Sequence, residues 1–156
     1  MALKSHTDII INGEKLQMNT NELVDEIYKE AEVIDLSLIL ALYYPKHSVA
    51  IPLTTKICDM DIESLELSVR SYNCLKRAGV ANVRNLVEII HNGEFMRIRN
   101  LGKKSRIEIQ EKILDIGYDA LTASEKYDFI TDVVERNRDN FRTEPIDIDQ
   151  VNFDVD

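Results

Sequence analysis

The stretch NLGKKS, residues Asn100–Ser105, has the residue types of an anion site at the start of a helix. Gly102 lets the backbone turn and lets a ligand come close, because glycine has no Cβ. The first amide groups of the helix that follows have no partners inside that helix and can bind an anion. Lys103 and Lys104 add positive charge, and Ser105 adds a hydroxyl. By itself, this pattern is more typical of an ordinary capped helix with two surface lysines than of a phosphate site.

The stretch VRSYNCLK, residues Val69–Lys76, adds side chains suited to a nucleic-acid groove. Arg70 and Asn73 are three positions apart, so both project from one face of the helix predicted here. A guanidinium suits the narrow, negative minor groove of DNA, and an amide can reach a base edge or a sugar. Standing alone, the pair is more simply read as two polar residues on a solvated helix face.

Three short helices with glycine stops are predicted to position these residues. Ser68 can cap a first helix that Gly79 ends. A second helix, VRNLVEIIH, begins after Asn82 and ends before Gly93. The third, KKSRIEIQEKILDI, follows the NLG turn and is predicted to close at Gly117.

The segment before these helices combines a hairpin pattern with a helical pattern. An Asn-Gly pair within Asp8–Met18 suits a type I′ turn and predicts a small hairpin. Asn19 and Glu22 form a capping-box pattern, and a helix is predicted from there to about Tyr44. Val49–Ile57 has the composition of a strand, but its proline restricts it to a sheet edge or to an extended linker.

The segment after the three helices is predicted to contain one more helix and a tail. Ser124 opens the helix SEKYDFITDVVERNRDNF, whose apolar side includes Tyr127, Ile130 and Phe141. The tail TEPIDIDQVNFDVD alternates acidic and apolar residues and is predicted to be flexible.

Charge is distributed unevenly along the 156 residues, whose formal net charge is −9. Residues 1–57 contribute −3 and residues 122–156 contribute −6, whereas basic and acidic side chains cancel in residues 58–121. The excess of acidic residues therefore lies in the two flanking segments, and the central region can keep a cationic surface for a polyanion.

The remaining reactive residue types form no enzyme or metal pattern. His6, His47 and His91 are isolated, and Cys58 and Cys74 lack partners at ligand spacing, so no metal site is expected. Both cysteines are predicted to be reduced thiols, with Cys74 packed inside a helix.

Since no nucleophile–base set, paired carboxylates or Walker-type loop is present, we expect neither catalysis nor a cofactor. No run approaches the roughly 18 apolar residues of a membrane span, and the N-terminus lacks a signal-peptide pattern, which predicts a soluble cytoplasmic protein.

Taken together, the two stretches resemble the C-terminal domain of the bacterial RNA polymerase alpha subunit, over about Ile62–Tyr118. The resemblance implies a mainly α fold, a compact bundle of short helices with a helix-hairpin-helix unit. It also implies binding to the minor groove of AT-rich promoter DNA and contacts with RNA polymerase, sigma factor or activators. An alpha subunit has a much longer N-terminal assembly domain before this module, so the chain is interpreted as a stand-alone relative.

The resemblance assigns DNA contacts residue by residue. Arg70 would enter the groove. Lys104, Ser105 and the Gly102 amide would hold backbone phosphate, and Glu108 would orient a basic neighbour or a water-mediated contact. The DNA-contacting positions implied in this way are Arg70, Asn73, Cys74, Asn100, Gly102, Lys104, Ser105 and Glu108, and Lys103 joins them by its charge.

Two further positions match protein-contacting residues of that family. Glu66 matches an acidic position used toward sigma, and Lys76 matches one near the activator-facing surface. The sequence also departs from the family pattern, because Ser64 stands where an acidic residue is expected and Tyr72 replaces a usually small residue.

Three segments are predicted: an N-terminal extension at 1–57, the DNA-binding domain at 58–121, and a helix with an acidic tail at 122–156. The leading hypothesis is a non-enzymatic, transcription-associated protein that binds DNA. The alternative is a protein-interaction adaptor of the same fold, in which the acidic tail masks the DNA site or mimics DNA. The apolar stretch LSLILALYY is predicted either to pack on the central domain or to form a homodimer interface.

Overall fold

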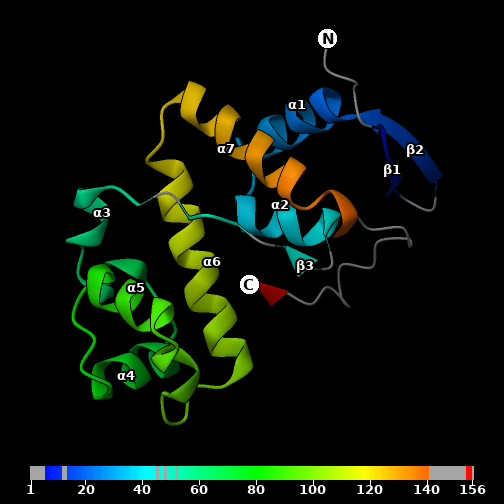
Figure 1. Ribbon diagram of the computed structural model, residues 1–156. Coiled ribbons are helices and arrows are strands. Elements are labelled where there is room, and N and C mark those ends of the chain that lie inside the picture. Colours follow the sequence, from blue (N-terminus) through cyan, green and yellow to red (C-terminus); the bar gives the residue numbers. More distant parts are fainter. Residues whose placement is uncertain are drawn as a thin grey trace. The chain divides into compact units, whose positions relative to one another are not determined.

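The computed structural model describes residues 6–11, 14–44, 46–47, 49–51, 53–140 and 154–155. These residues are mainly helical, as predicted, and the chain divides into two units (Figure 1). Unit 1 comprises Met1–Ala50 and Tyr118–Asp156, and unit 2 comprises Ile51–Gly117. None of the helices in the described part of the chain is long and apolar enough to cross a membrane.

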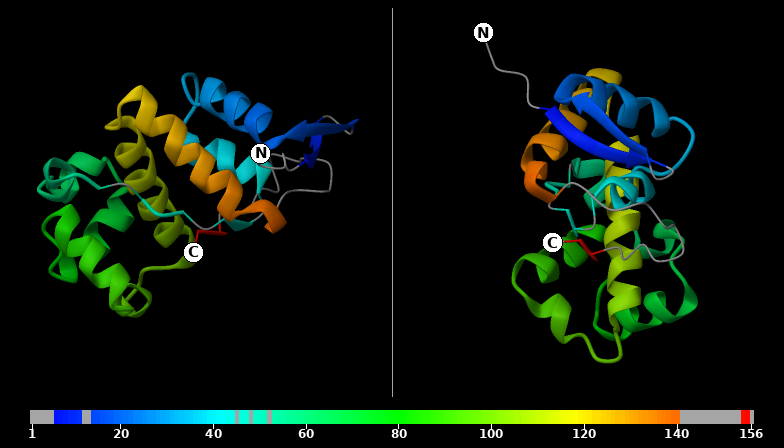
Figure 2. Two further views of the ribbon diagram at one scale, coloured as in Figure 1. Left: turned by 45° about the horizontal axis from the view of Figure 1, so that its top comes forward. Right: turned by 90° about the vertical axis from the view of Figure 1, so that its right-hand side faces the viewer.

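Unit 1 begins with the predicted hairpin. Strands β1 (His6–Ile11) and β2 (Glu14–Asn19) pair antiparallel, with Ile11 opposite Glu14. The Asn-Gly pair between them lies outside the described residues. The hairpin leads into helix α1 (Thr20–Glu30), as Figure 2 shows. The predicted capping box is confirmed, because the Glu22 N–H donates to Asn19 Oδ1 at 2.8 Å and the Glu22 carboxylate accepts from the Asn19 N–H.

The prediction of one continuous helix to Tyr44 is wrong. Helix α1 ends at Glu30, and a separate helix, α2 (Leu36–Tyr43), follows a turn that leaves Val33 85% exposed. β-Branched residues in this turn favour a break, and the break lets α2 fold back so that both helices bury an apolar face. The Tyr43 hydroxyl donates to both carboxylate oxygens of Glu30, at 3.1 and 3.2 Å, and so fixes α2 against α1. A homodimer through this stretch stays a prediction.

Helix α7 (Ala123–Arg136) begins at a different cap from the one predicted. Thr122, rather than Ser124, is the N-cap, because its hydroxyl accepts from the Glu125 N–H and the Glu125 carboxylate accepts from the Thr122 N–H. Such reciprocal bonds satisfy two amide groups at once, which a cap at Ser124 would not do. The helix ends at Arg136, before the short 3₁₀ turn η3 (Arg138–Asn140), and Phe141 lies outside the described residues.

Helix α7 packs against α1, so the two flanking segments of the sequence share one unit (Figure 1). The Tyr127 hydroxyl donates to Asp25 Oδ1 at 2.7 Å, and the Tyr28 and Tyr127 rings meet edge to face. Unit 1 also contains the short parallel pair β3 (Lys46–His47) and β4 (Asp154–Val155). Most of the predicted tail lies outside the described residues.

Unit 2 starts with the short helix α3 (Thr55–Cys58), which corrects the strand predicted for Val49–Ile57. The Thr54 hydroxyl accepts from the Ile57 N–H at 3.3 Å and starts a helical turn where the strand was expected. The described residues before Thr54 form neither helix nor strand, in keeping with the alternative of a linker.

Short helices form the rest of unit 2. A 3₁₀ helix, η1 (Ile62–Leu65), precedes α4 (Val69–Arg77) and α5 (Val83–His91), and another, η2 (Glu94–Arg97), precedes α6 (Lys103–Asp119). Figure 1 shows α4 and α5 beside α6, and these helices share one apolar core. The fully or largely buried core residues are Ile57, Ile62, Leu65, Cys74, Leu75, Val80, Val83, Leu86, Phe95, Leu101, Ile109 and Ile113.

The predicted boundaries of α4 and α5 are confirmed. Ser68 and Asn82 are the N-caps, each accepting from the amide three residues on. Gly79 and Gly93 follow the helix ends, both with φ of 81°, a left-handed conformation that glycine adopts without a steric penalty.

Helix α6 continues past Gly117 to Asp119, so the predicted closure at that glycine is wrong. A helical glycine costs only about 1 kcal/mol relative to alanine. The next residue, Tyr118, is 2% exposed and lies close to Phe129 and Lys126 of α7. Packing of Tyr118 therefore outweighs the weak local preference of Gly117 to end the helix.

Candidate nucleic-acid interface

The start of α4 is held by a set of local and long-range hydrogen bonds. The Ser71 N–H donates to Ser68 Oγ at 3.3 Å, which caps the helix. The Ser68 N–H and Ser68 Oγ both donate to Glu108 Oε1, at 3.2 and 3.1 Å. Glu108 lies on α6, so its carboxylate places a negative charge at the N-terminus of α4, where the helix dipole favours one.

The NLG turn is fixed by the residues around it. The Leu101 side chain is buried, and its carbonyl accepts from Arg106 Nη1 at 2.6 Å. The Asn100 carbonyl accepts from the buried thiol of Cys74 at 3.5 Å. Asn100, with φ of 66°, adopts the left-handed conformation of the turn. Gly102 is not among the residues with positive φ; asparagine, which tolerates the left-handed region, supplies that conformation two positions earlier.

Gly102 directly precedes the first residue of α6, Lys103, and has open space beside its Cα. The Gly102 carbonyl accepts the first helical bond, from the Arg106 N–H at 3.0 Å. A Cβ at this position would meet no heavy atom within 4 Å, so the space above the first turn is empty of protein. The first-turn amide groups of an α-helix make no bonds within that helix, and such groups can bind an anion.

The two helix starts face one open hollow of about 480 Å³. Arg70, Lys103 and Lys104 contribute three positive charges to its lining, against the single carboxylate of Glu108. Within the described part of the chain, neither Arg70 nor Lys104 is engaged in an ion pair. The lining residues are Ser68, Arg70, Ser71, Gly102, Lys103, Lys104, Ser105 and Glu108.

The hollow gathers six of the nine predicted DNA-contacting residues. Of the other three, Asn73 is exposed on α4, where it shares the helix with Arg70, and Asn100 is exposed in the turn. Cys74 is only 3% exposed, so it supports the turn from beneath. Sequence reasoning recognised Ser68 as a cap but missed that it and Ser71 line the hollow; the cap pattern itself was the available signal.

The role that the resemblance implies for Glu108, toward a basic neighbour or a water-mediated contact, stays a prediction. Both of its described hydrogen bonds come from Ser68, not from a basic neighbour. The Glu108 carboxylate therefore lies at the start of α4, where it occupies the place that an external anion would take.

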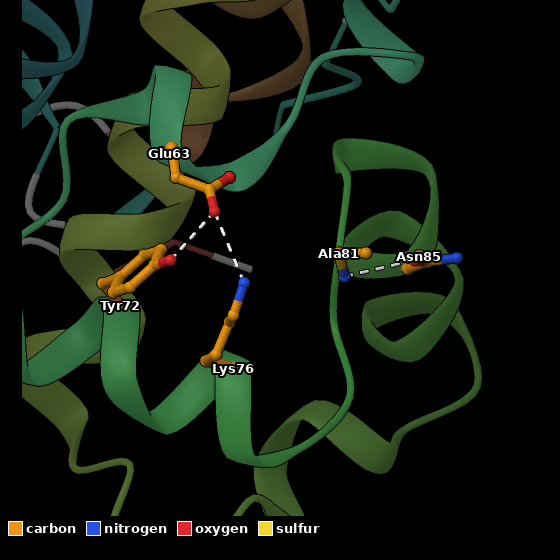
Figure 3. A network of polar contacts seen from close by, with 5 residues as sticks. All are labelled: Glu63, Tyr72, Lys76, Ala81 and Asn85. Atoms are coloured by element: carbon orange, nitrogen blue, oxygen red, sulfur yellow. Dashed lines mark hydrogen bonds and ion pairs between the residues drawn. The ribbon is translucent and has the colours of Figure 1, made fainter.

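The two predicted protein-contacting residues lie outside the hollow. Glu66 is exposed, with φ of 51°, and ends η1. Lys76 is exposed on α4, and its Nζ lies 3.4 Å from Glu63 Oε1 (Figure 3). No group of three or more His, Cys, Asp or Glu side chains in the described residues could hold a metal ion.

The bundle of short helices in unit 2 is consistent with the fold of an RNA polymerase alpha C-terminal domain, and comparison with known proteins identifies the same class. Residues 50–115 match the family of the C-terminal domain of the bacterial RNA polymerase alpha subunit. This central part of the molecule is therefore a relative of that domain.

Two similar curated proteins are both called DNA-directed RNA polymerase subunit alpha. The subunit of Fusobacterium nucleatum is 39% identical over 118 residues, which cover 75% of this chain and 31% of that protein. The subunit of Desulforudis audaxviator is 52% identical over 64 residues, which cover 41% of this chain and 20% of that protein. The matched part is thus less than a third of each relative. No solved structure matches the chain significantly.

The similarity to the Fusobacterium protein is longer than the resemblance found from the motifs. An alignment of 118 residues exceeds the matched range 50–115 and so continues into at least one flank. The flanks carry no motif with recognisable chemistry, which is why inspection of the sequence alone found only the central domain.

Proposed function

We propose that unit 2 binds double-stranded DNA through the hollow between the starts of α4 and α6, in a non-enzymatic role in transcription. The observation that carries this proposal is the gathering of Arg70, Lys103 and Lys104 around an open helix start in a domain related to the alpha C-terminal domain. A cationic hollow beside the start of a helix is suited to a phosphate backbone.

The two sides of the hollow have different tasks in this proposal. The α6 side holds backbone phosphate through the first-turn amides, Lys104 and the Ser105 hydroxyl, which are contacts without sequence preference. The α4 side presents Arg70 to the minor groove, where AT-rich sequence narrows the groove and strengthens its negative potential. Asn73, three positions along the same helix, would reach a base edge or a sugar.

The proposed protein partners are RNA polymerase, sigma factor and activators. Glu66 and Lys76 match the positions that suggest these contacts, and both side chains are exposed. Ser64 is exposed and uncharged where the family pattern has an acid, which weakens any electrostatic attraction to a basic sigma surface.

Titration of a labelled duplex across a salt series tests DNA binding at the hollow. Lys104→Gln removes a proposed phosphate contact, so the slope of log K against log salt concentration should fall by about 1. Arg84→Gln is the matched control, because it removes the same charge from unit 2 at a residue that pairs with Asp59 on another surface.

The two variants should separate clearly. A lower slope for Lys104→Gln, with the control at the wild-type slope, supports the proposed site. If both variants lower the slope by the same amount, DNA binding depends only on net charge. If neither variant lowers it, Lys104 makes no phosphate contact. Either result would exclude the hollow as the binding site. Absence of binding by the folded wild type at low salt would reject DNA binding and leave a protein partner as the ligand of this domain.

A further inference from the structure

Tyr72 joins two charged side chains on the surface of unit 2. Its hydroxyl donates to Glu63 Oε1 at 2.9 Å, and Lys76 Nζ lies 3.4 Å from the same oxygen. The ammonium also lies 5.8 Å from the centre of the Tyr72 ring. Figure 3 shows the three side chains meeting, with Glu63 on η1 and the other two on α4.

The contacts favour the charged forms of both partners. The pKa of Glu63 is lowered by its own backbone amide, by the Tyr72 hydroxyl and by Lys76. The pKa of Lys76 is raised by contact with the Tyr72 hydroxyl first and with Glu63 second. At neutral pH the ammonium and the carboxylate are therefore both ionised, and each compensates the charge of the other.

Lys76 begins close to the surface of α4 that is proposed to bind DNA. Lys76 follows Asn73 by three residues, so the two side chains start from neighbouring places on the helix surface. Its side chain is nevertheless directed to Glu63, on the Tyr72 side of the helix. A lysine beside the proposed DNA-binding surface is thus paired with a carboxylate of the same domain.

An exposed ion pair between a lysine and a carboxylate is weak on its own. The side chains of Lys76 and Glu63 are 60% and 53% exposed, so solvent competes with the pairing. Tyr72 adds a hydrogen bond that fixes the carboxylate and a ring face that attracts the ammonium. The tyrosine therefore decides how firmly the lysine is held.

We propose that Tyr72 is a positioning residue that holds Lys76 on Glu63 and so withholds one cation from DNA. This inference rests on the proposed function of unit 2. It makes the domain a weaker nonspecific binder and leaves more of the affinity to Arg70 in the groove.

Tyr72→Phe tests the inference without changing the charge of the protein. The variant keeps the ring and loses the hydrogen bond to Glu63, so the carboxylate is held less firmly and Lys76 can leave it for phosphate more readily. We expect tighter duplex binding by a few fold at low salt and a slope of log K against log salt concentration that steepens by up to about 1. In a Lys76→Gln background the same substitution should change neither value.

Tyr127→Phe is the matched control, because Tyr127 also donates from its hydroxyl to an exposed carboxylate, that of Asp25, but in unit 1. It should leave the slope unchanged. NMR of the Lys76 ammonium nitrogen in the free protein adds a readout independent of DNA, and Tyr72→Phe should make that ammonium more mobile.

The outcomes distinguish this inference from the proposed function. Binding by the wild type with an unchanged slope in Tyr72→Phe would overturn the role of Tyr72 alone. So would a steeper slope that persists in the Lys76→Gln background. Absence of DNA binding by all proteins, wild type included, would overturn the proposed function and this inference with it, even if the NMR signal shows Lys76 to be held.

Discussion

The carboxylate of Glu108 accepts hydrogen bonds from both the N–H and the hydroxyl of Ser68, 40 residues earlier in the sequence, at 3.2 and 3.1 Å. This contact ties the start of α4 to the first turns of α6. It fixes Arg70 relative to Gly102 and Lys104, which the two helices carry separately. The geometry of the hollow therefore depends on one acidic side chain within a cationic site.

Replacement of Glu108 tests that dependence. Glu108→Ala should lower the free energy of unfolding by about 1 kcal/mol, because a charge-assisted helix cap is lost. It should also weaken duplex binding although a negative charge is removed, since Arg70 loses its fixed position. Glu108→Gln should do less on both counts, because the amide oxygen can still accept from Ser68. Tighter binding by Glu108→Ala would show that the carboxylate merely repels DNA.

Gly102→Ala should affect DNA affinity far more than it affects stability. The methyl group meets no atom within 4 Å, so the free energy of unfolding should change by no more than about 1 kcal/mol. The same methyl group would stand above the first turn of α6, where phosphate is proposed to lie, and affinity for duplex DNA should fall by roughly tenfold. Thermal unfolding and duplex titration of the same preparation give both values. Unchanged affinity would mean that DNA does not approach this backbone.

The stability of unit 2 should depend on the side chains that α6 buries in the core. Ile109 is fully buried among the core residues, so Ile109→Ala should lower the free energy of unfolding by about 2–5 kcal/mol. Met96, 65% exposed, offers a control, and Met96→Ala should cost less than about 0.5 kcal/mol. Denaturant unfolding measures both. Similar small losses in the two variants would show that α6 is not packed as described.

Glu30 should make unit 1 less stable as pH rises. Burial raises the pKa of Glu30 above 4.5, its bond from Tyr43 opposes the rise in part, and nearby Glu26 adds to it. Above its ordinary pKa the unfolded state has lost this proton while the folded state still holds it, so folding is disfavoured as pH increases through this interval. Glu30→Gln keeps an acceptor for Tyr43 but cannot titrate.

The stability difference between Glu30→Gln and wild type should therefore grow in favour of the variant as pH rises through and above the ordinary pKa of glutamate. Denaturant unfolding at several pH values measures it. A difference that is constant, or that moves the other way, would contradict the assignment. Glu125→Gln is a useful comparison, because the pKa of Glu125 is lowered by the Thr122 amide and hydroxyl, so its charged form stabilises the fold as pH rises.

The elements predicted best from the sequence are those fixed by neighbouring residues. Ser68, Asn82 and the Asn19–Glu22 box each cap a helix as expected, because a side chain and an amide three positions away decide the cap. The break before α2 was missed although β-branched residues in the turn favour it, because the apolar spacing runs on across the turn. The continuation of α6 past Gly117 was missed because packing of Tyr118 against α7 decides it.

The candidate site shows the same division. Arg70, Lys103 and Lys104 were found from residue type and spacing, and the structure brings them to one hollow. The pairing of Glu108 with Ser68 spans 40 residues, and the Tyr72–Glu63–Lys76 contact joins two elements, so neither leaves a local pattern in the sequence.

Binding to an AT-rich and a GC-rich duplex across a salt series, for wild type, Arg70→Ala and Arg70→Lys, tests the central claim most directly. Wild type should prefer the AT-rich duplex, and Arg70→Ala should lose at least about tenfold in affinity for it. Arg70→Lys should keep salt-dependent binding but lose the preference, because an ammonium is more strongly hydrated than a guanidinium and fits the narrow groove less well. Equal affinity of wild type for both duplexes, with Arg70→Ala binding as tightly as wild type, would contradict a minor-groove reader built on α4.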